Sequence, residues 1–257
     1  MDDSAAFSLR IAEAATIKRS RIILALDLTD RSGLNEFALR TISKLESYIC
    51  AIKLNFHLLL PLSSSELSEV NRLAHSYGLE SIADIKLNDI PSTNKVAITH
   101  LSSMGFDATT VNPFIGIAGL RAAVVQAHEL KSGILALVYM SHIGAQGGFG
   151  INFIGSSSQL TSLYQKFFQD AIACRVDGVI VGANRLEILR EISCNKDRIP
   201  IYSPGVGVQG GKIKQAAQRG TDYFIIGRSI IRSRDPLKTA RTLRNHLARV
   251  KTAQFML

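Results

Sequence analysis

Asp84, Lys86 and Asp89 form a short charged motif, Asp-x-Lys-x-x-Asp, at the end of a mostly apolar stretch. Because Asp84 and Lys86 are two positions apart, both side chains point to the same face if the stretch is a β-strand. A carboxylate and an ammonium held side by side in a partly desolvated place keep each other ionised and can set pKa values for proton transfer. The motif therefore predicts acid–base chemistry or, as the alternative, a structural ion-pair network.

Other polar residues stand where further apolar stretches end. Asp27 closes the first stretch, Lys53 comes near the end of the second, and Ser141 follows the fifth. If these stretches are parallel strands, Asp27 and Lys53 extend the motif to a larger array of alternating charges. The histidines, including His142, show no metal-ligand spacing, so we expect surface or packing roles for them. We expect Met140 to be a core residue.

A glycine-rich segment covers residues 203–211, and Gly227-Arg228 follows the next apolar stretch. Glycines let a backbone approach a ligand closely and let a loop move. In α/β barrels the loops after the seventh and eighth strands commonly bind phosphate through backbone amides. The Arg228 guanidinium suits phosphate oxygens, and Gln209 could reach the same group. We predict a phosphate site here, with an ordinary tight loop as the alternative.

Short apolar runs rich in β-branched residues recur at regular intervals along the chain. Their almost continuous hydrophobicity is typical of parallel strands covered on both faces. We predict eight strands, at 21–28, 48–55, 80–87, 108–114, 133–140, 178–183, 199–206 and 223–230. Segments with helical periodicity lie between or after them, at 32–45, 64–77, 92–104, 117–130, 158–174, 185–193, 210–219 and 236–250.

This alternation predicts an α/β fold, a single (β/α)8 TIM barrel that spans residues 1–257. Residues 1–20 would form an additional N-terminal helix that closes the barrel bottom. An open doubly wound sheet is the main alternative, but such a sheet usually has a glycine-rich turn after its first strand, and Asp27-Leu28-Thr29 is not one. Active sites of barrels lie at the carboxyl ends of the strands, where the polar residues above are expected.

Composition narrows the class of protein further. A hydrophobic content of 46% excludes a disordered chain, and no apolar run reaches the roughly 18 residues that a membrane helix needs. The N-terminus lacks the features of a secretory signal, so we expect a cytoplasmic protein. The net charge is +9. Lys and Arg residues are scattered along the sequence. As explanations of the positive charge, we therefore rank a solvated surface first, a phosphorylated small substrate second and specific nucleic-acid binding last.

With these residues in place, the sequence resembles the orotidine 5′-phosphate decarboxylase family, most closely its compact archaeal-type members. The resemblance covers nearly the whole chain, from Leu24-Ala25-Leu26-Asp27 to Gly227-Arg228-Ser229. It includes the Asp-x-Lys-x-x-Asp motif, Ile90-Pro91-Ser92-Thr93, Met140-Ser141-His142 and the glycine-rich segment. A wider superfamily shares the charged motif alone, whereas all these motifs in this order are specific to the family.

The resemblance implies an enzyme of pyrimidine biosynthesis that converts orotidine 5′-phosphate to UMP and CO2 without a cofactor or a metal. Lys86 would donate a proton to C6 of the pyrimidine. Asp84 would lie against the departing carboxylate and position Lys86. Lys53 and Asp89 would complete an alternating Lys-Asp-Lys-Asp array.

The resemblance also implies a homodimer in which Asp89 and Thr93 act across the interface. Implied substrate contacts are Asp27 and Lys53 at the ribose, Ser141 at the pyrimidine, Gln209, Gly227 and Arg228 at the phosphate, and the loop residues Pro204, Gly205, Val206, Gly207, Gly210 and Gly211.

The nearest alternative is a Mg²⁺-dependent sister enzyme, such as a sugar-phosphate decarboxylase or a hexulose-phosphate synthase. Those enzymes resemble this chain in the charged motif but have a Glu near the end of the second strand. Lys53-Leu54-Asn55 occupies that region here, which disfavours a metal site. A nucleotide-binding or nucleic-acid-binding barrel without catalysis is a rival from another class, and the intact set of charges argues against it.

Overall fold

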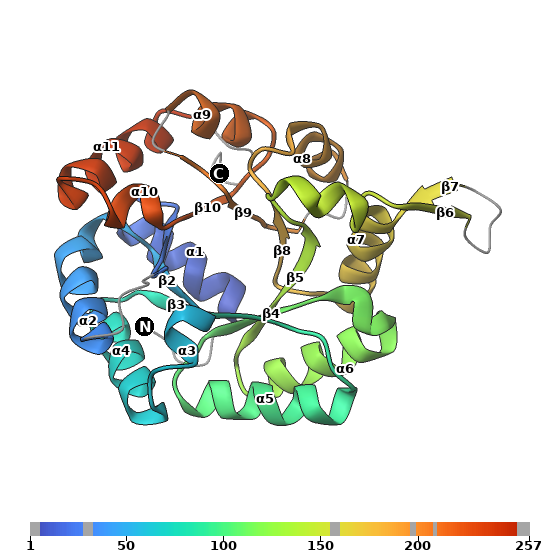
Figure 1. The fold of residues 1–257 in the computed structure, drawn as a ribbon, viewed down its shortest axis with the longest axis horizontal. Helices are drawn as coiled ribbons and strands as arrows, with labels where there is room; N and C mark the ends of the chain where they lie inside the picture. Colours follow the sequence, from blue (N-terminus) through green and yellow to red (C-terminus); the bar gives the residue numbers. More distant parts are fainter. Residues whose placement is uncertain (1–5, 28–32, 155–159, 196–198, 208–209, 251–257) are drawn as a thin grey trace.

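The computed structural model describes residues 6–27, 33–154, 160–195, 199–207 and 210–250. Eight parallel strands close into a barrel in the order β1-β10-β9-β8-β5-β4-β3-β2, with helices around it (Figure 1). The strands are β1 (Ile22–Ala25), β2 (Ala51–Asn55), β3 (Glu80–Leu87), β4 (Ala108–Val111), β5 (Gly133–Tyr139), β8 (Gly178–Val181), β9 (Ile201–Pro204) and β10 (Tyr223–Ile226). The predicted α/β barrel is therefore confirmed.

Helices surround the barrel, most of them on its outside and α1 at one end. The longer ones are α1 (Phe7–Ile17), α2 (Leu34–Leu45), α4 (Ser64–Ser76), α5 (Pro91–Ser103), α6 (Gly116–Glu129), α7 (Leu163–Cys174), α8 (Leu186–Ser193), α9 (Gly210–Gln218) and α11 (Pro236–Ala248). Short helices α3 (Phe56–Leu59) and α10 (Arg228–Ile231) directly follow strands β2 and β10. No helix in the described part of the chain is long and apolar enough to cross a membrane.

The strands are buried on both faces because they separate two apolar cores. One core fills the layer between strands and helices, where Leu24, Ile52 and Val179 are fully buried. The other fills the barrel interior, where the rings of Tyr202 and Tyr223 stack with centroids 4.8 Å apart. This two-sided burial is the physical reason for the continuous apolar runs in the sequence.

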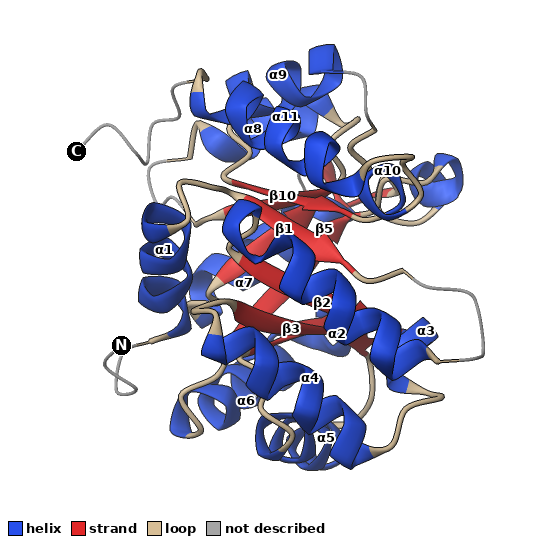
Figure 2. Ribbon diagram, turned by 90° about the vertical axis from the view of Figure 1, so that its left-hand side faces the viewer, coloured by secondary structure: helices blue, strands red, loops and turns tan. Residues whose placement is uncertain are grey.

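Helix α1 closes the end of the barrel where the strands begin, as predicted for residues 1–20 (Figure 2). Phe7 and Ile11 point into the barrel-interior core and are each 1% exposed. A Cβ added to Gly133, the first residue of β5, would lie 2.6 Å from the Phe7 ring. Glycine at this position therefore leaves room for the Phe7 ring of α1, the helix that plugs this end of the barrel.

A charge network ties α1 to the strand starts beside the plug. The Arg10 guanidinium contacts the carboxylates of Glu80 at 3.1 Å and Asp107 at 3.2 Å. Asp107 also accepts a hydrogen bond from the backbone amide of Ser81 at 2.7 Å. Its other partner is His75 on α4, with Nε2 and Oδ2 2.8 Å apart. These charges stabilise the closed end of the barrel and lie far from the strand ends that carry the site.

His75 should make barrel stability depend on pH. Its hydrogen bond to Asp107 raises the pKa of His75 above the ordinary 6.5, so the stabilisation is complete below that pH and is lost as the pH rises through the folded-state value. We expect His75→Gln to lower the unfolding midpoint temperature more at about pH 5.5 than at about pH 8.5. Thermal melts of both proteins at the two pH values test this, and an equal loss at both would contradict it.

The structure corrects several predicted element boundaries. The helix predicted at 158–174 begins at Leu163, and Leu160–Ser162 is instead strand β7, paired with β6 (Asn152–Ile154) in a hairpin that projects from the barrel (Figure 1). Ser162 and Gln165 form a capping box that marks the true start of α7. The strand predicted at 223–230 ends at Ile226, because the chain turns at Gly227 into α10.

Candidate active site

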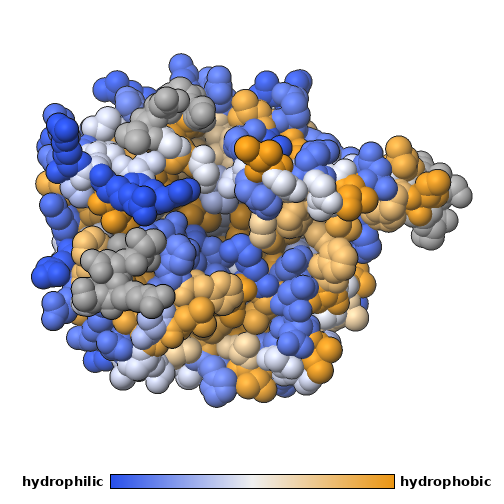
Figure 3. Space-filling model, in the orientation of Figure 1, coloured by the Kyte–Doolittle hydropathy of each residue, from blue (hydrophilic) through white to orange (hydrophobic). Residues whose placement is uncertain are grey.

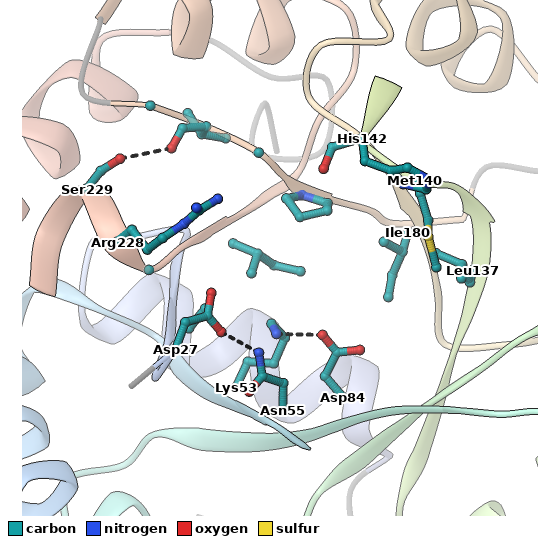
Figure 4. Close-up of a pocket in the computed structure, with 18 of the residues that line it drawn as sticks. Asp27, Lys53, Asn55, Asp84, Leu137, Met140, His142, Ile180, Arg228 and Ser229 are labelled. Carbon is teal, nitrogen blue, oxygen red and sulfur yellow. Dashed lines mark hydrogen bonds and ion pairs between the residues drawn. The ribbon is translucent and has the colours of Figure 1, made fainter. Parts of the chain in front are cut away.

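A cavity of about 640 Å³ opens at the carboxyl ends of the barrel strands. Its floor is apolar, formed by Ala25, Leu137, Ile180 and Ile225 from the strands themselves. Its walls carry most of the residues singled out from the sequence: Asp27, Lys53, Asp84, Lys86, Ser141, Pro204, Gly205, Val206, Gly207, Gly227 and Arg228. Residues from seven strands or from the loops directly after them therefore converge on one space, and Figure 4 shows the labelled side chains among them.

Asp84 is the centre of the charged wall. Lys53 Nζ on β2 lies 2.5 Å from Asp84 Oδ2, and Lys86 Nζ lies 2.6 Å from Asp84 Oδ1. The two strands bring these groups together because Asn55 on β2 pairs with Asp84 on β3. Lys53 is two residues before Asn55, so its side chain points to the same face of the sheet as Asp84. A single buried carboxylate thus bridges two ammonium groups.

The pKa of Asp84 reflects this arrangement. Burial by itself would raise it, but the charges and hydrogen bonds of Lys53 and Lys86 outweigh burial and lower the Asp84 pKa to about 2. Asp84 therefore stays ionised at any pH where the protein would work. Its negative charge is fixed at the cavity wall and faces any group that occupies the cavity.

Lys86 reaches Asp84 through an irregular backbone rather than a regular strand. The β3–β4 register runs from Ala83↔Thr109 to Leu87↔Val111, so β3 has two more residues than β4 in this interval. Within this bulge Lys86 adopts a left-handed backbone, with φ +49°. Strand alternation correctly placed Asp84 and Lys86 at one cavity, but it did not predict the bulge.

Two further polar residues hold the charged groups of the site in place: Thr110, which the sequence analysis did not single out, and Asn55, a polar strand-end residue to which it assigned no role. Thr110 on β4 accepts a hydrogen bond from the Lys86 backbone amide at 2.8 Å and donates one to Asp84 Oδ1 at 3.1 Å. Asn55 donates a hydrogen bond from Nδ2 to Asp27 Oδ1 at 2.7 Å (Figure 4). Threonine is an ordinary strand residue, so nothing in the sequence marked Thr110, whereas Asn55 shared the strand-end position of Lys53.

Ser141 is held between two neighbouring loops. A Cβ on Gly182 would lie 2.7 Å from Ser141 Cα, and one on Gly205 would lie 2.8 Å from Ser141 Cβ. Gly205 also has φ +87°, a backbone conformation that favours glycine. Asn184 Nδ2 donates to the Ser141 carbonyl at 2.9 Å. This packing fixes the serine at the cavity wall.

The predicted phosphate site lies on the side of the cavity away from Asp84. Arg228 points into the cavity from the start of α10, beside Ser229, whose hydroxyl donates to the Val206 carbonyl at 3.4 Å (Figure 4). This contact joins the loop after β9 to helix α10. Gly210 and Gly211 begin helix α9, and Gln209 lies outside the described residues.

Asp89 and Thr93 are not at the cavity of their own chain. Both are exposed, in the β3–α5 loop and the first turn of α5. The loop itself is well anchored, since buried Asn94 donates to the Asp89 carbonyl at 2.6 Å and the Ile90 amide donates to Asp89 Oδ1 at 2.7 Å. A barrel on its own therefore brings together Lys53, Asp84 and Lys86 but not Asp89.

His142 is exposed and Met140 packs against both apolar cores, as expected, but neither was expected at the site. Both line the cavity at the end of β5 (Figure 4). The His142 carbonyl accepts a hydrogen bond from Arg185 Nη2 at 2.8 Å, which ties its loop to the loop after β8. Both residues are direct neighbours of Ser141 in the sequence. This position could have predicted that they line the cavity, because the loop after a barrel strand turns over it.

The comparisons with known proteins agree with this geometry. Residues 20–243 match the model of the orotidine 5′-phosphate decarboxylase / HUMPS family. The chain belongs to this family. Orotidine 5′-phosphate decarboxylase of Pyrococcus abyssi is 36% identical over 223 residues, which are 86% of this chain and 96% of the relative.

Solved structures of the decarboxylase family have the same fold. The enzyme of Pyrococcus horikoshii is 32% identical with a TM-score of 0.71, over 88% of this chain and 98% of that one. The enzyme of Methanocaldococcus jannaschii, solved in complex with the inhibitor BMP, is 28% identical with a TM-score of 0.74, over 89% of this chain and 98% of that one. The resemblance found in the sequence motifs is thus confirmed at the level of the family.

Proposed function

We propose that this member of the decarboxylase family converts orotidine 5′-phosphate to UMP and CO2 by direct loss of the carboxylate, with Lys86 as the proton donor. The observation that carries the proposal is the Asp84 carboxylate bridged by the Lys53 and Lys86 ammonium groups at 2.5 and 2.6 Å in the wall of a deep cavity. The similarity to enzymes named as orotidine 5′-phosphate decarboxylases supports the choice of substrate.

The chemistry needs a fixed cation beside the reacting carbon. When the bond from C6 to the carboxylate breaks, its electron pair stays in an sp² orbital that the ring π system cannot absorb. A preorganised Lys86 ammonium stabilises this charge electrostatically. It then transfers its proton to C6, which forms the C–H bond of UMP and leaves a neutral amine.

Asp84 has two roles in this proposal. Its carboxylate, which stays ionised because its pKa is about 2, holds the Lys86 ammonium in place at 2.6 Å. The same negative charge would face the substrate carboxylate and favour its departure, a contribution that we treat as secondary. Lys53 neutralises the other oxygen of Asp84 and would contact the ribose together with Asp27.

The phosphate would bind on the opposite wall, at Arg228, the Gly227 amide and the loop after β9, with Gln209 reaching the same group. Phosphate is remote from C6, so its binding energy can serve to order the loop and the site rather than act on the bond that breaks. Ser141 would hydrogen-bond the pyrimidine between these two ends.

Arg228→Ala tests the phosphate assignment. We expect kcat/KM for orotidine 5′-phosphate to fall by about 100-fold, chiefly through KM, because a charge-assisted bidentate contact is lost. Arg232→Ala, which removes an exposed arginine one turn further along, is the matched control. The measurements are kcat and KM for orotidine 5′-phosphate and the affinity for inorganic phosphate and for UMP in each variant. Unchanged affinities in Arg228→Ala would contradict the assignment.

We further propose a homodimer in which Asp89 and Thr93 complete the site of the other subunit. Exposed apolar side chains are common in the segments that follow strands β2, β3 and β4, namely Phe56, Leu60, Ile90, Val96 and Phe114. Figure 3 shows apolar surface gathered around α3. Apolar patches of this kind rimmed by polar residues mark protein interfaces, which supports pairing of two barrels through their site ends.

The test of the proposed function is an absorbance assay for loss of orotidine 5′-phosphate in excess chelator. We expect full activity, because both Asp84 oxygens are already occupied by ammonium groups where a cation would have to bind. Hexulose-phosphate synthase activity restored by Mg²⁺, without decarboxylation in chelator, would support the sister-enzyme alternative instead.

A further inference from the structure

Thr110 occupies a position between the two charged residues that the mechanism uses. It lies on β4, is 0% exposed and does not line the cavity directly. Its hydroxyl accepts a hydrogen bond from the Lys86 amide at 2.8 Å and donates one to Asp84 Oδ1 at 3.1 Å. A hydroxyl has one donor and two acceptor positions, so it can make both bonds at once.

The bulge in β3 explains why Lys86 needs such a partner. In a regular parallel ladder the Lys86 amide would donate to a backbone carbonyl of the neighbouring strand. The register instead passes from Ala83↔Thr109 to Leu87↔Val111, which removes that pairing. The Thr110 hydroxyl takes the place of the missing carbonyl, and Lys86 is held with φ +49°, a conformation that non-glycine residues rarely adopt.

The second bond of the hydroxyl acts on the other member of the pair. Asp84 Oδ1 accepts both the Thr110 hydroxyl at 3.1 Å and the Lys86 ammonium at 2.6 Å. The Thr110 hydroxyl thus holds Lys86 at both ends. It binds the backbone amide of Lys86, and it binds the Asp84 carboxylate that contacts the Lys86 ammonium. A shift of this hydroxyl would move the ammonium relative to the cavity without removing any charge.

We propose that Thr110 is a positioning residue for the reaction, and that its hydroxyl fixes the Lys86 ammonium against the carbon to be protonated. The inference rests on the proposed function, since it assigns Thr110 a part in the same decarboxylation. It assigns no contact between Thr110 and the substrate.

Three variants test the proposal in the intact chain. Thr110→Val keeps the shape and removes the hydroxyl, Thr110→Ser keeps the hydroxyl, and Thr109→Val removes a buried hydroxyl from the other face of the same strand. We expect Thr110→Val to lower kcat by roughly 100-fold, the size of effect that a misplacement of about 1 Å produces. KM and the affinity for UMP should change by less than about threefold, and Thr110→Ser and Thr109→Val should stay within about tenfold of the wild-type kcat.

Several results would overturn the proposal. One is a wild-type kcat in Thr110→Val, and another is an equal loss in Thr110→Ser or Thr109→Val. A parallel loss of kcat, UMP affinity and melting temperature in Thr110→Val would indicate a merely structural role.

Amide hydrogen exchange at Lys86 gives a readout that does not need activity. We expect faster exchange of this amide in Thr110→Val than in the wild type, because its acceptor is gone. If the wild-type protein does not decarboxylate orotidine 5′-phosphate, the proposed function fails, and the exchange rate still decides whether Thr110 holds Lys86. Equal exchange rates of the Lys86 amide in the wild type and in Thr110→Val would refute the claim that Thr110 holds Lys86.

Discussion

Replacing Lys86 with alanine is expected to abolish the decarboxylation of orotidine 5′-phosphate. The variant loses both the cation that stabilises charge at C6 and the proton that ends the reaction, so we expect kcat to fall by roughly 10⁴-fold or more. The measurement is single-turnover loss of substrate absorbance at saturating enzyme, which separates chemistry from binding.

The control for this variant is Lys238→Ala, which removes an exposed lysine from α11. Lys238→Ala should keep the wild-type rate. Lys86→Ala should still fold and bind UMP, since Arg228 and the loop after β9 remain in place. Turnover by Lys86→Ala near the wild-type rate would refute the proposed role of Lys86, whatever its affinity for UMP.

Mixing two inactive variants is expected to restore activity if Asp89 acts across the dimer. Lys86→Ala and Asp89→Asn homodimers each have two defective sites. After subunit exchange, each hybrid has one site in which an unchanged Lys86 meets an unchanged Asp89 from the other chain. Because half of the dimers are hybrids at random exchange, we expect recovery of about one quarter of the wild-type activity.

The matched control mixes Lys86→Ala with Asp84→Asn. Asp84 and Lys86 line one cavity of the same chain, 2.6 Å apart, so no hybrid contains an intact site and no recovery is expected. Absence of recovery in the Lys86→Ala and Asp89→Asn mixture, with hybrids present by native mass spectrometry, would show that Asp89 does not complete the other subunit's site.

Much of the fold was predictable from local rules of the sequence. Continuous apolar runs predicted all eight barrel strands, because parallel strands buried on both faces cannot tolerate alternating polar residues. Helical periodicity predicted the helices between them. Polar residues at strand ends predicted which side chains line the cavity, since all the strands of such a barrel end on the same side.

Where local patterns were ambiguous, sequence reasoning placed boundaries wrongly. Leu160–Ser162 continues into the α7 sequence without a Gly or Pro break, so the strand of the hairpin was taken for the first turn of the helix. Similarly, Ile226 is followed by further apolar residues after Gly227, although the chain turns there into α10. The ends of these elements are decided by strand pairing and by turns. Both depend on contacts between residues distant in the sequence, which hydrophobic periodicity does not report.

The sequence by itself determined which charges the site has and at which strand ends they lie. Only the tertiary structure decided how they are held. Lys86 has a left-handed backbone because β3 bulges against β4, and its amide finds an acceptor because Thr110 lies across that gap. Those contacts join residues 24 positions apart. Local spacing cannot encode them, because the register between two strands is set by the packing of the whole barrel.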